Sequence, residues 1–188
     1  MFLQRHGECV TNRMKVFTCR KLDPSLTETG RRQIENRVLY YGSFDIERIV
    51  TSPSKRAIES AEILSSRLGI DYQTNECLLE IDVGDLEGES ERDPENLQRF
   101  FSVIKDWLIR SKNTRFPGGE SKDDVEERLK VLDSLISSNP AILVGHATLF
   151  AVFLGTRGNS FERVEHLFLA RAGIAKYCPG ARTWSIES

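Results

Sequence analysis

Short apolar runs alternate along this chain with longer stretches in which apolar residues recur at helical spacing. The run AILVG is continuously apolar, as expected of a central parallel strand that is covered on both faces. Strands are predicted at residues 1–4, 48–53 and 141–145. Helices are predicted at residues 27–41, 54–68, 94–111 and 121–139. This alternation predicts an α/β sandwich with a mainly parallel sheet.

Residues at the ends of the helical stretches support the predicted boundaries. The Thr27 hydroxyl can accept from free N–H groups at a helix N-terminus, and Gly42 tolerates a left-handed helix exit. Ser121 and Asp124 have the spacing of a capping box. Gly69 is placed to end the second helix.

The rest of the chain predicts an edge hairpin and no second domain. Short strands at residues 173–178 and 182–187 flank a Pro179-Gly180 turn. There is no internal repeat, low-complexity tract or linker, so a single domain over residues 1–188 is expected. A domain of 188 residues can bury roughly 70% of its unfolded-chain surface without disulfides or metals, and it can therefore hold a preorganised enzyme site.

The charge balance gives no indication of a nucleic acid or membrane partner, because 26 basic and 28 acidic residues leave a net charge of -2. Residues 1–32 carry a basic excess, which suits either an anionic small molecule or an ordinary solvated face. The four cysteines lack C-x-x-C or metal-ligand spacing, and the N-terminus lacks signal-peptide features, so a cytoplasmic location is expected. No apolar run approaches the ~20 residues that span a bilayer.

Candidate phosphate-binding side chains follow three of the predicted strands. Arg5 and His6 follow the first strand, Ser52 and Arg56 follow the second, and His146 follows AILVG. Because the carboxyl ends of parallel strands meet at one edge of a sheet, these groups are expected to lie close together. The alternative for each histidine is an ordinary structural or exposed residue.

Six motifs carry a resemblance to a known family. In chain order they are RHGECVTN, LTETG, TSPSKRAIESA, LLEIDVGDLEG, FPGGES and LVGHAT. Together they resemble the histidine phosphatase superfamily, over about residues 3–150. The resemblance implies a phosphoglycerate mutase-like fold, a three-layer α/β/α sandwich with a mainly parallel central sheet, and a phosphorylated histidine intermediate. The catalytic residues it implies are Arg5, His6, Arg56, Glu80 and His146. The substrate-binding residues expected are Arg5, Asn12, Thr18, Arg56, His146 and Ala147.

The chemistry of phosphoryl transfer supports these assignments. Neutral His6 can attack phosphorus, while Arg5 and Arg56 can hold the non-bridging oxygens with planar, paired donors. His146 is expected to donate to the same oxygens. The resemblance makes Glu80 the acid that protonates the leaving oxygen and later activates water, a role that suits a carboxyl with a raised pKa. The acidic rivals from the same loop are Asp82, Asp85 and Glu87.

Glycines and basic residues near the motifs have further interpretations. Gly7 and Gly145 are expected to let the backbone pass close to the phosphate. The basic side chains of Arg13, Arg20 and Lys21 could equally approach the substrate or solvate a loop.

Other polar residues are weaker candidates. Glu120 and Ser121 belong to FPGGES, which is also a turn that leads into a capped helix. His166 is assigned no chemistry, because FERVEHLFLA predicts an amphipathic helix. Neither Cys9 nor Cys19 has the flanking pattern of a catalytic thiol. The acidic run over residues 82–95 lacks metal-ligand spacing, so no metal is expected.

Two departures from the family pattern bear on the reaction. Thr18-Cys19 stands where mutase-like members have Thr-Gly, at a backbone contact to phosphate. Mutases place Arg and Tyr soon after the catalytic glutamate to hold a carboxylate, whereas Glu80 is followed by IDVGDLEG. Asp82 would repel such a carboxylate. A phosphomonoester hydrolase with a phosphohistidine intermediate is therefore expected. A cofactor-dependent phosphoglycerate mutase and a catalytically idle phospho-ligand-binding module are the alternatives.

The expected partner is a small phosphorylated metabolite, with no nucleic acid and no membrane, and the expected protein is a monomer or homodimer. No cofactor is expected, and 2,3-bisphosphoglycerate would be needed only by the mutase alternative. A cap or insertion is expected at about residues 82–116, where Phe100, Phe101 and Trp107 would cover the pocket.

Overall fold

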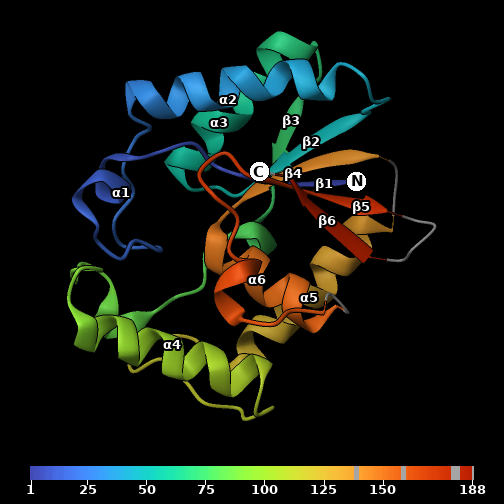
Figure 1. Ribbon diagram of the computed structural model, residues 1–188. Coiled ribbons are helices and arrows are strands. Elements are labelled where there is room, and N and C mark those ends of the chain that lie inside the picture. The colour runs from blue at the N-terminus through green and yellow to red at the C-terminus, as the bar shows by residue number, and fades with distance from the viewer. Residues whose placement is uncertain (138–139, 158–159, 179–182, 188) are drawn as a thin grey trace.

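A six-stranded sheet in the order β3-β2-β4-β1-β5-β6 forms the centre of the computed structural model (Figure 1). The structure describes residues 1–137, 140–157, 160–178 and 183–187. The strands are β1 (Phe2–Arg5), β2 (Arg48–Thr51), β3 (Tyr72–Thr74), β4 (Ala141–Gly145), β5 (Ile174–Cys178) and β6 (Thr183–Glu187). The first four lie parallel, while β5 pairs antiparallel with β1 and β6. The predicted, mainly parallel sheet is confirmed.

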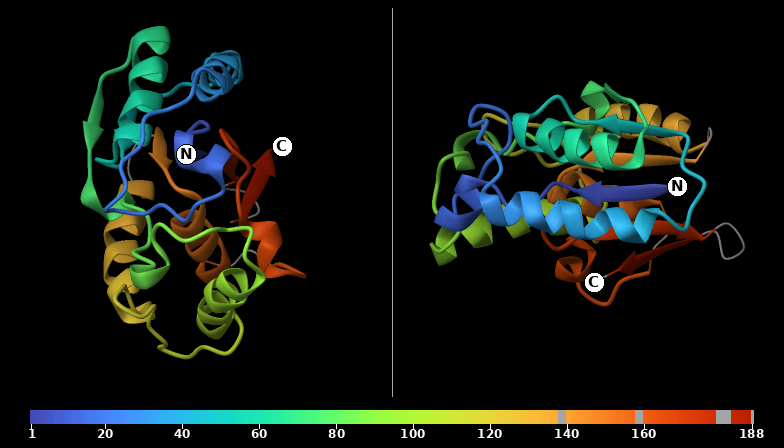
Figure 2. Two further views of the ribbon diagram at one scale, coloured as in Figure 1. Left: turned by 90° about the vertical axis from the view of Figure 1, so that its left-hand side faces the viewer. Right: turned by 90° about the horizontal axis from the view of Figure 1, so that it is seen from above.

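Helices cover both faces of this sheet and complete three layers (Figures 1 and 2). They are α1 (Val10–Met14), α2 (Glu28–Tyr41), α3 (Lys55–Leu68), α4 (Pro94–Leu108), α5 (Lys122–Ile136) and α6 (Ala147–Thr156). Three 3₁₀ turns are η1 (Glu76–Leu78), η2 (Gly84–Leu86) and η3 (Val164–Leu167). One apolar core lies between the sheet and the α2 and α3 layer, and a larger one lies beneath α4, α5 and α6. The predicted three-layer architecture is therefore confirmed.

The helix caps predicted from the sequence form, with one correction. The Thr27 hydroxyl accepts from the Gly30 N–H at 3.0 Å, and Ser121 and Asp124 form a reciprocal capping box. Gly69 ends α3 in the left-handed region, at φ +70°. Gly42 ends α2 at φ -61°, so the left-handed exit expected there was wrong. The chain turns into β2 without needing the glycine's conformational freedom.

Other differences concern segments in which tertiary packing overrides the local pattern. The predicted amphipathic helix around His166 is instead the single turn η3, and His166 is exposed. Two elements were not predicted: β3, a short and largely exposed edge strand, and α6, whose all-round apolar character hides its helical period. The predicted edge hairpin is present as β5 and β6, and its Pro179-Gly180 turn lies outside the described residues.

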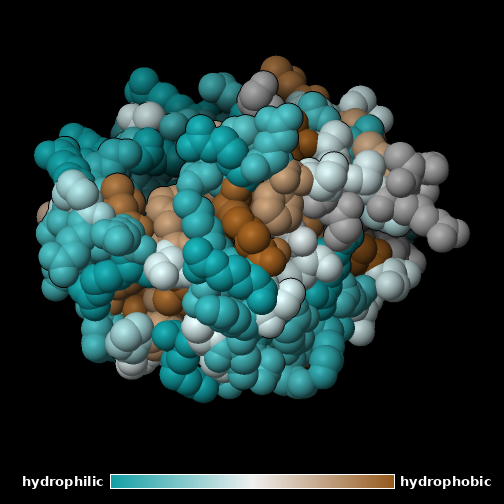
Figure 3. Space-filling model, turned by 60° about the horizontal axis from the view of Figure 1, so that its bottom comes forward, coloured by the Kyte–Doolittle hydropathy of each residue, from teal (hydrophilic) through white to brown (hydrophobic). Residues whose placement is uncertain are grey.

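The surface turned forward in Figure 3 is largely hydrophilic, with hydrophobic side chains reaching it in a few places. Among the described residues, no helix combines the length and the hydropathy needed to cross a bilayer.

Candidate active site

The carboxyl ends of three parallel strands meet beside one cavity. Arg5 at the end of β1 pairs in register with Gly145 at the end of β4, and the Ser52 N–H donates to the Val144 carbonyl at 2.9 Å. The cavity has a volume of about 240 Å³. Of the predicted site residues, it is lined by Arg5, His6, Asn12, Thr18, Arg56, Glu80 and Ala147. Residues far apart in the sequence thus lie together at the carboxyl edge of the sheet, as their positions after the strands predicted.

The His6 ring is held in one orientation by its own backbone. Nδ1 lies 2.6 Å from the Gly7 carbonyl oxygen, which can only accept, so Nδ1 carries the proton and Nε2 carries the free lone pair. The side chain is only 3% exposed. Burial, and then the charges of Arg56 and Arg5, lower the pKa of His6 well below its usual value. The imidazole is therefore neutral at physiological pH, as a nucleophile must be.

Two guanidinium groups reach the cavity with donors left over. Arg5 Nη1 donates to the Leu169 carbonyl at 2.7 Å, while its buried Nε has no hydrogen-bond partner in the described part of the chain. Arg56 is 1% exposed and donates through Nη2 to the Cys19 carbonyl at 3.1 Å. Its Nη1 lies 3.7 Å from Asp23 Oδ1 and makes no hydrogen bond to any described residue. These donors suit an anion with several acceptor oxygens.

His146 lies behind the cavity and not on its wall. Its ring centroid is 5.2 Å from that of His6, and its Nε2 is hydrogen-bonded to Ser52 Oγ at 2.8 Å. Its buried Nδ1 makes no hydrogen bond within the described residues. Burial, followed by the charge of Arg56, lowers the pKa of His146 well below its usual value. The structure thus places a neutral second histidine beside the first, while the neighbouring Ala147 lines the cavity.

Glu80 joins the cavity to the N-terminus of α6. Its Oε1 accepts from the N–H groups of Ile81 and Leu149, both at 2.9 Å, and its Oε2 accepts from the Thr148 N–H at 3.1 Å. Because Oε2 has a single donor, it keeps a lone pair on which a proton can be carried. The carboxyl is fixed by three backbone contacts at the edge of the cavity.

The three acidic rivals of Glu80 do not line the cavity. Asp82 Oδ1 accepts from the Gly84 N–H at 2.9 Å, and Asp85 is exposed. Glu87 Oε1 accepts from three N–H groups in residues 19–22. Burial alone would raise the pKa of Glu87, but these N–H groups outweigh it and lower the pKa below its usual value. Glu87 therefore organises a loop, and Glu80 is the member of this group that reaches the cavity.

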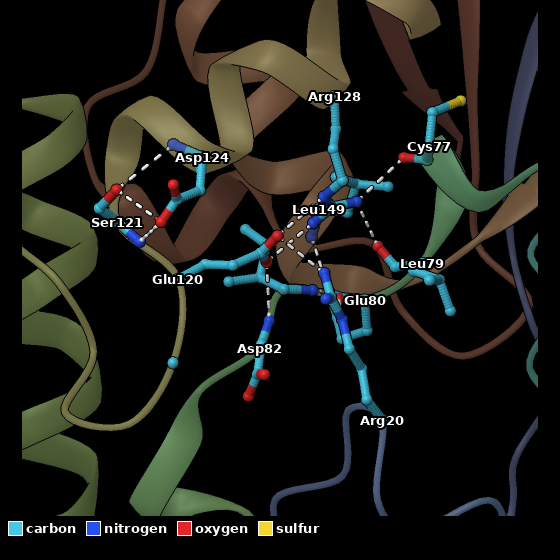
Figure 4. A network of polar contacts seen from close by, with 12 residues as sticks. Arg20, Cys77, Leu79, Glu80, Asp82, Glu120, Ser121, Asp124, Arg128 and Leu149 are labelled. Atoms are coloured by element: carbon cyan, nitrogen blue, oxygen red, sulfur yellow. Dashed lines mark hydrogen bonds and ion pairs between the residues drawn. The ribbon is translucent and has the colours of Figure 1, made fainter.

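A polar network holds the segment that carries Glu80 (Figure 4). Arg128 on α5 forms a forked ion pair with both Glu120 oxygens at 2.9 Å, and its Nη1 donates to the carbonyls of Cys77 and Leu79. Glu120 also accepts from the Asp82 N–H at 2.9 Å. Residues 77–82 are thus fixed on both sides of Glu80.

Arg20 completes this network from another part of the chain. It donates to Glu120 at 2.7 Å and to the Glu80 carbonyl at 3.2 Å (Figure 4). Arg20 therefore holds the Glu80 segment in place. The sequence had suggested that Arg20 either approaches the substrate or solvates a loop. Arg13 and Lys21 are exposed and do not line the cavity. Arg128 was missed, because nothing in the sequence distinguishes it from any other charged residue of a helix.

Comparisons with known proteins agree on one family. A family model for the histidine phosphatase superfamily, branch 1, matches residues 1–188. The chain belongs to the histidine phosphatase superfamily. It is 32% identical over 195 residues to a bifunctional protein of Mycobacterium tuberculosis, covering 96% of this chain and 51% of that protein. The chain thus spans about half the length of the curated relatives that it matches first.

Solved structures share the fold. A phosphoglycerate mutase from Thermus thermophilus superposes with a TM-score of 0.68 at 26% identity, covering 93% of this chain and 90% of that one. A mycobacterial glucosyl-3-phosphoglycerate phosphatase gives a TM-score of 0.72 at 22% identity, covering 100% and 96% respectively, which shows the fold alone. Curated relatives of this chain carry the names of both phosphoglycerate mutases and phosphatases.

The two glycines predicted to accommodate the phosphate have packing roles. A Cβ on Gly7 would lie 2.3 Å from the Gly30 carbonyl oxygen, so this glycine lets the strand end approach α2. A Cβ on Gly145 would lie 2.6 Å from the Phe150 ring. In this member of the superfamily, both glycines bring elements together around the cavity, and their expected closeness to the phosphate stays a prediction.

Thr18-Cys19 stands where mutase-like members have Thr-Gly. Local hydrogen bonds show what the backbone does at this position. The Cys19 N–H donates to Glu87 Oε1 at 3.1 Å, so it is already taken by a side chain. Thr18 donates through its hydroxyl to the Val16 carbonyl at 3.1 Å and lines the cavity. Asn12 also lines the cavity, and its Oδ1 accepts from the Cys9 N–H at 3.2 Å. The Asn12 amide nitrogen is the group left to reach a ligand.

The ligand-capable atoms of Cys19, Asp82 and Glu87 lie within 4.8 Å of one another. Burial raises the pKa of the Cys19 thiol well above its usual range, so the thiol is protonated when no metal ion is bound. Glu87 is occupied by three N–H donors, as described above. This cluster is accordingly a part of the loop structure beside the cavity.

The apolar part of the cavity was only partly foreseen. Phe100 and Phe101 line it, as predicted. Trp107 does not: it is buried against Phe116, and its indole N–H donates to the Thr114 carbonyl at 2.8 Å. The lining residues not predicted from the sequence are Phe17, Cys19, Val83, Glu91, Leu97, Thr148 and Phe168. Val83 and Thr148 lie within the quoted motifs, and the others come from loops and α4 outside them.

Proposed function

We propose that the protein is a phosphomonoester hydrolase that forms a phosphohistidine intermediate at Nε2 of His6. The observation that carries this proposal is the setting of His6. Its Nδ1 is committed to the Gly7 carbonyl and its ring is kept neutral, so Nε2 is left as the free nucleophile. It lies on the same cavity as Arg5 and Arg56, each of which has an unused donor.

The first half of the reaction follows from these positions. Nε2 attacks phosphorus and forms an N–P bond, while the P–O bond to the leaving alcohol breaks. Arg5 and Arg56 stabilise the charge on the three equatorial oxygens. The N-terminus of α6, where Ala147 begins the helix, favours negative charge at the same place. Glu80 gives the proton on Oε2 to the leaving oxygen, so a neutral alcohol departs.

In the second half, the same carboxylate acts as base. Glu80 takes a proton from water, the water oxygen attacks phosphorus, and the N–P bond breaks to release phosphate and neutral His6. His146 lies beside His6, and its Nδ1, which makes no hydrogen bond to a described residue, is available to bond the phosphoryl group of the intermediate. No metal ion or organic cofactor takes part in this scheme, because the guanidinium groups supply the positive charge.

Hydrolysis is favoured over the mutase alternative by the charges of the cavity. Among the described residues, the basic side chains that line it are Arg5 and Arg56, and both serve the phosphoryl group. A phosphoglycerate would need a further cation for its carboxylate, and the remaining lining offers Glu91 and aromatic rings instead. The combination of His6, both arginines and Glu80 also disfavours an idle binding module. The segment at about residues 82–116 acts as the cap in this proposal, since α4 contributes three lining residues.

The test measures phosphate release from sugar phosphates, nucleotides, phosphoglycerates and 4-nitrophenyl phosphate. Rapid quench under alkaline conditions should trap an acid-labile phosphate on wild-type protein and none on His6→Ala. His166→Ala, which removes an exposed histidine outside the cavity, is the matched control and should keep full activity. Conversion of 3-phosphoglycerate to 2-phosphoglycerate in the presence of 2,3-bisphosphoglycerate, faster than hydrolysis, would favour the mutase. Turnover by His6→Ala would overturn the covalent mechanism.

A further inference from the structure

One wall of the cavity is apolar and built to be rigid. It is formed by Phe17, Leu97, Phe100, Phe101 and Phe168. The Phe100 ring packs against those of Phe17, Phe101 and Phe168, with centroids 5.3, 5.2 and 6.1 Å apart. Aromatic pairs at such separations stabilise one another beyond the apolar area that they bury. The wall therefore presents a preformed apolar surface to the group that the phosphate esterifies.

Glu91, like Glu80, is an acidic residue that lines the same cavity. Its backbone is fixed, because its N–H donates to the Lys15 carbonyl at 2.7 Å and the preceding Ser90 forms a bridge with Val16. Its side chain is half-buried and forms no hydrogen bond or ion pair with a described residue, and its charge acts on Arg5 by raising the pKa of that guanidinium against the larger, lowering effect of burial. Because this carboxylate lines the cavity without a hydrogen-bonding partner of its own, a ligand that brings positive charge to it is favoured.

The charge balance of the cavity points in the same direction. Its charged lining, among the described residues, consists of two guanidinium groups, Arg5 and Arg56, and two carboxyl groups, Glu80 and Glu91. A phosphate dianion uses the positive charge of the guanidinium groups, so Glu91 faces any further charge on the substrate without compensation. A second anionic group is repelled there, while a cation gains from the carboxylate and from the faces of the rings.

We propose that the enzyme selects phosphomonoesters whose leaving alcohol is small and combines an apolar part with a positively charged group, such as the phosphate esters of amino alcohols or aminophenols. Glu91 is the residue that selects the charge. This inference rests on the proposed hydrolase function and gives it a substrate class. The cavity of about 240 Å³ sets the size, since it has room for a phosphate and a group of about one ring with a short arm.

The test compares two aryl phosphates that differ only in the charge at the end of a two-carbon arm. O-Phosphotyramine ends in an ammonium group, and the phosphate ester of 3-(4-hydroxyphenyl)propanoate ends in a carboxylate. Both leave as phenols of similar acidity, so their intrinsic reactivities match. We expect kcat/KM for the ammonium ester to exceed that for the carboxylate ester by roughly tenfold or more at low ionic strength.

The variant Glu91→Gln keeps the shape of the side chain and removes its charge. We expect the ratio of the two kcat/KM values to fall to within about threefold of unity, because hydrolysis of the ammonium ester slows while that of the carboxylate ester quickens. A purely structural disturbance would move both esters in the same direction. Glu89→Gln removes an exposed carboxylate two residues away that does not line the cavity, and it should keep the wild-type ratio.

The outcomes separate this inference from the proposed function. Equal kcat/KM values for the two esters in wild-type protein, or an unchanged ratio in Glu91→Gln, would overturn the inference and leave the hydrolase proposal intact. If no ester is hydrolysed, the hydrolase proposal fails, and calorimetric binding of the same two esters to His6→Ala decides the inference alone. Tighter binding of the ammonium ester that Glu91→Gln abolishes would support it, and equal binding would overturn it.

Discussion

At the scale of single residues, the cavity is organised around buried cations without full partners. Arg56 is almost completely buried, and among the described residues its Nη1 has an ion pair with Asp23 at 3.7 Å and no hydrogen bond. Removing such a group from water is costly, and the cost is recovered when an anion arrives with acceptor oxygens. Burial also lowers the pKa of Arg5, an effect that the charge of Glu80 partly offsets. These unused donors are what the proposed binding of phosphate requires.

The variant Arg56→Lys tests whether this binding depends on geometry or only on charge. A lysine keeps the positive charge but cannot contact the Cys19 carbonyl and two phosphate oxygens in one plane. We expect kcat/KM for 4-nitrophenyl phosphate to fall by roughly 10²-fold or more. Arg67→Lys, at an exposed position of the same helix, is the control and should retain wild-type kinetics. Near wild-type activity in Arg56→Lys would remove this guanidinium from the phosphate site.

The sequence predicted some of these residues and could not predict others. Arg5, His6 and Arg56 lie within motifs that follow strand ends, so pattern and resemblance both pointed to them. Glu91 lies in a polar loop with many other acidic residues, and only the fold shows that it reaches the cavity. The hydrogen bond between His6 and the Gly7 carbonyl is likewise a matter of side-chain rotamer, which no spacing encodes.

At the scale of elements, α5 holds the segment of residues 77–82 in place. No residue of α5 lines the cavity. Arg128 of α5 bonds the Cys77 and Leu79 carbonyls and the two oxygens of Glu120 (Figure 4). The N-terminus of α6 holds the Glu80 carboxyl from the other side. The proposed acid is therefore positioned by two helices, and loosening either should affect the step that needs a proton.

The variant Arg128→Met tests this positioning role. It leaves Glu120 half-buried with only Arg20 as its ionic partner, so we expect the free energy of unfolding to fall by roughly 2–3 kcal/mol. We also expect hydrolysis of an alkyl phosphate to slow by roughly tenfold more than that of 4-nitrophenyl phosphate, whose leaving group departs without a proton. Stopped assays at a temperature where the variant is fully folded measure both.

Two further variants decide how the result of Arg128→Met is interpreted. Arg128→Lys keeps the charge without the forked contact. It should slow hydrolysis of the alkyl ester by less than Arg128→Met does. Lys130→Met removes an exposed cation from the same helix and should change the hydrolysis rate of neither substrate. Equal slowing of both esters in Arg128→Met would show that Arg128 supports the fold without positioning Glu80.

The elements themselves were predictable where caps and periodicity agree. Thr27 and the pair of Ser121 and Asp124 set helix starts that the structure reproduces. By contrast, α6 is buried on all sides, so its sequence has no polar face to reveal a helical period. Around His166 the apolar spacing suggests a helix, but packing of Val164 and Leu167 into the core leaves only one turn.

At the scale of the whole molecule, the two buried histidines of the candidate site affect the stability of the fold. Both His6 and His146 are buried, and burial together with nearby arginines lowers the pKa of each well below the usual value of 6.5. The unfolded chain binds protons at these residues below about pH 6.5, whereas the folded chain does not. Their neutral form therefore stabilises the folded state fully above pH 6.5, and this stabilisation is lost as the pH falls.

The last prediction follows from this linkage. Between about pH 6.5 and 5 we expect the free energy of unfolding, measured by urea titration, to fall by up to roughly 1.4 kcal/mol per pH unit for each of the two histidines. Carboxyl groups with lowered pKa values, such as Glu87 and Glu120, act in the same direction but at lower pH, around and below their usual 4.5. His6→Gln should make the slope between pH 6.5 and 5 shallower by up to roughly 1.4 kcal/mol per unit, and it should leave the curve above pH 7.5 parallel to that of the wild type. An unchanged slope in His6→Gln would mean that His6 is protonated in the folded state, and the neutral nucleophile proposed for the first chemical step would have to be abandoned.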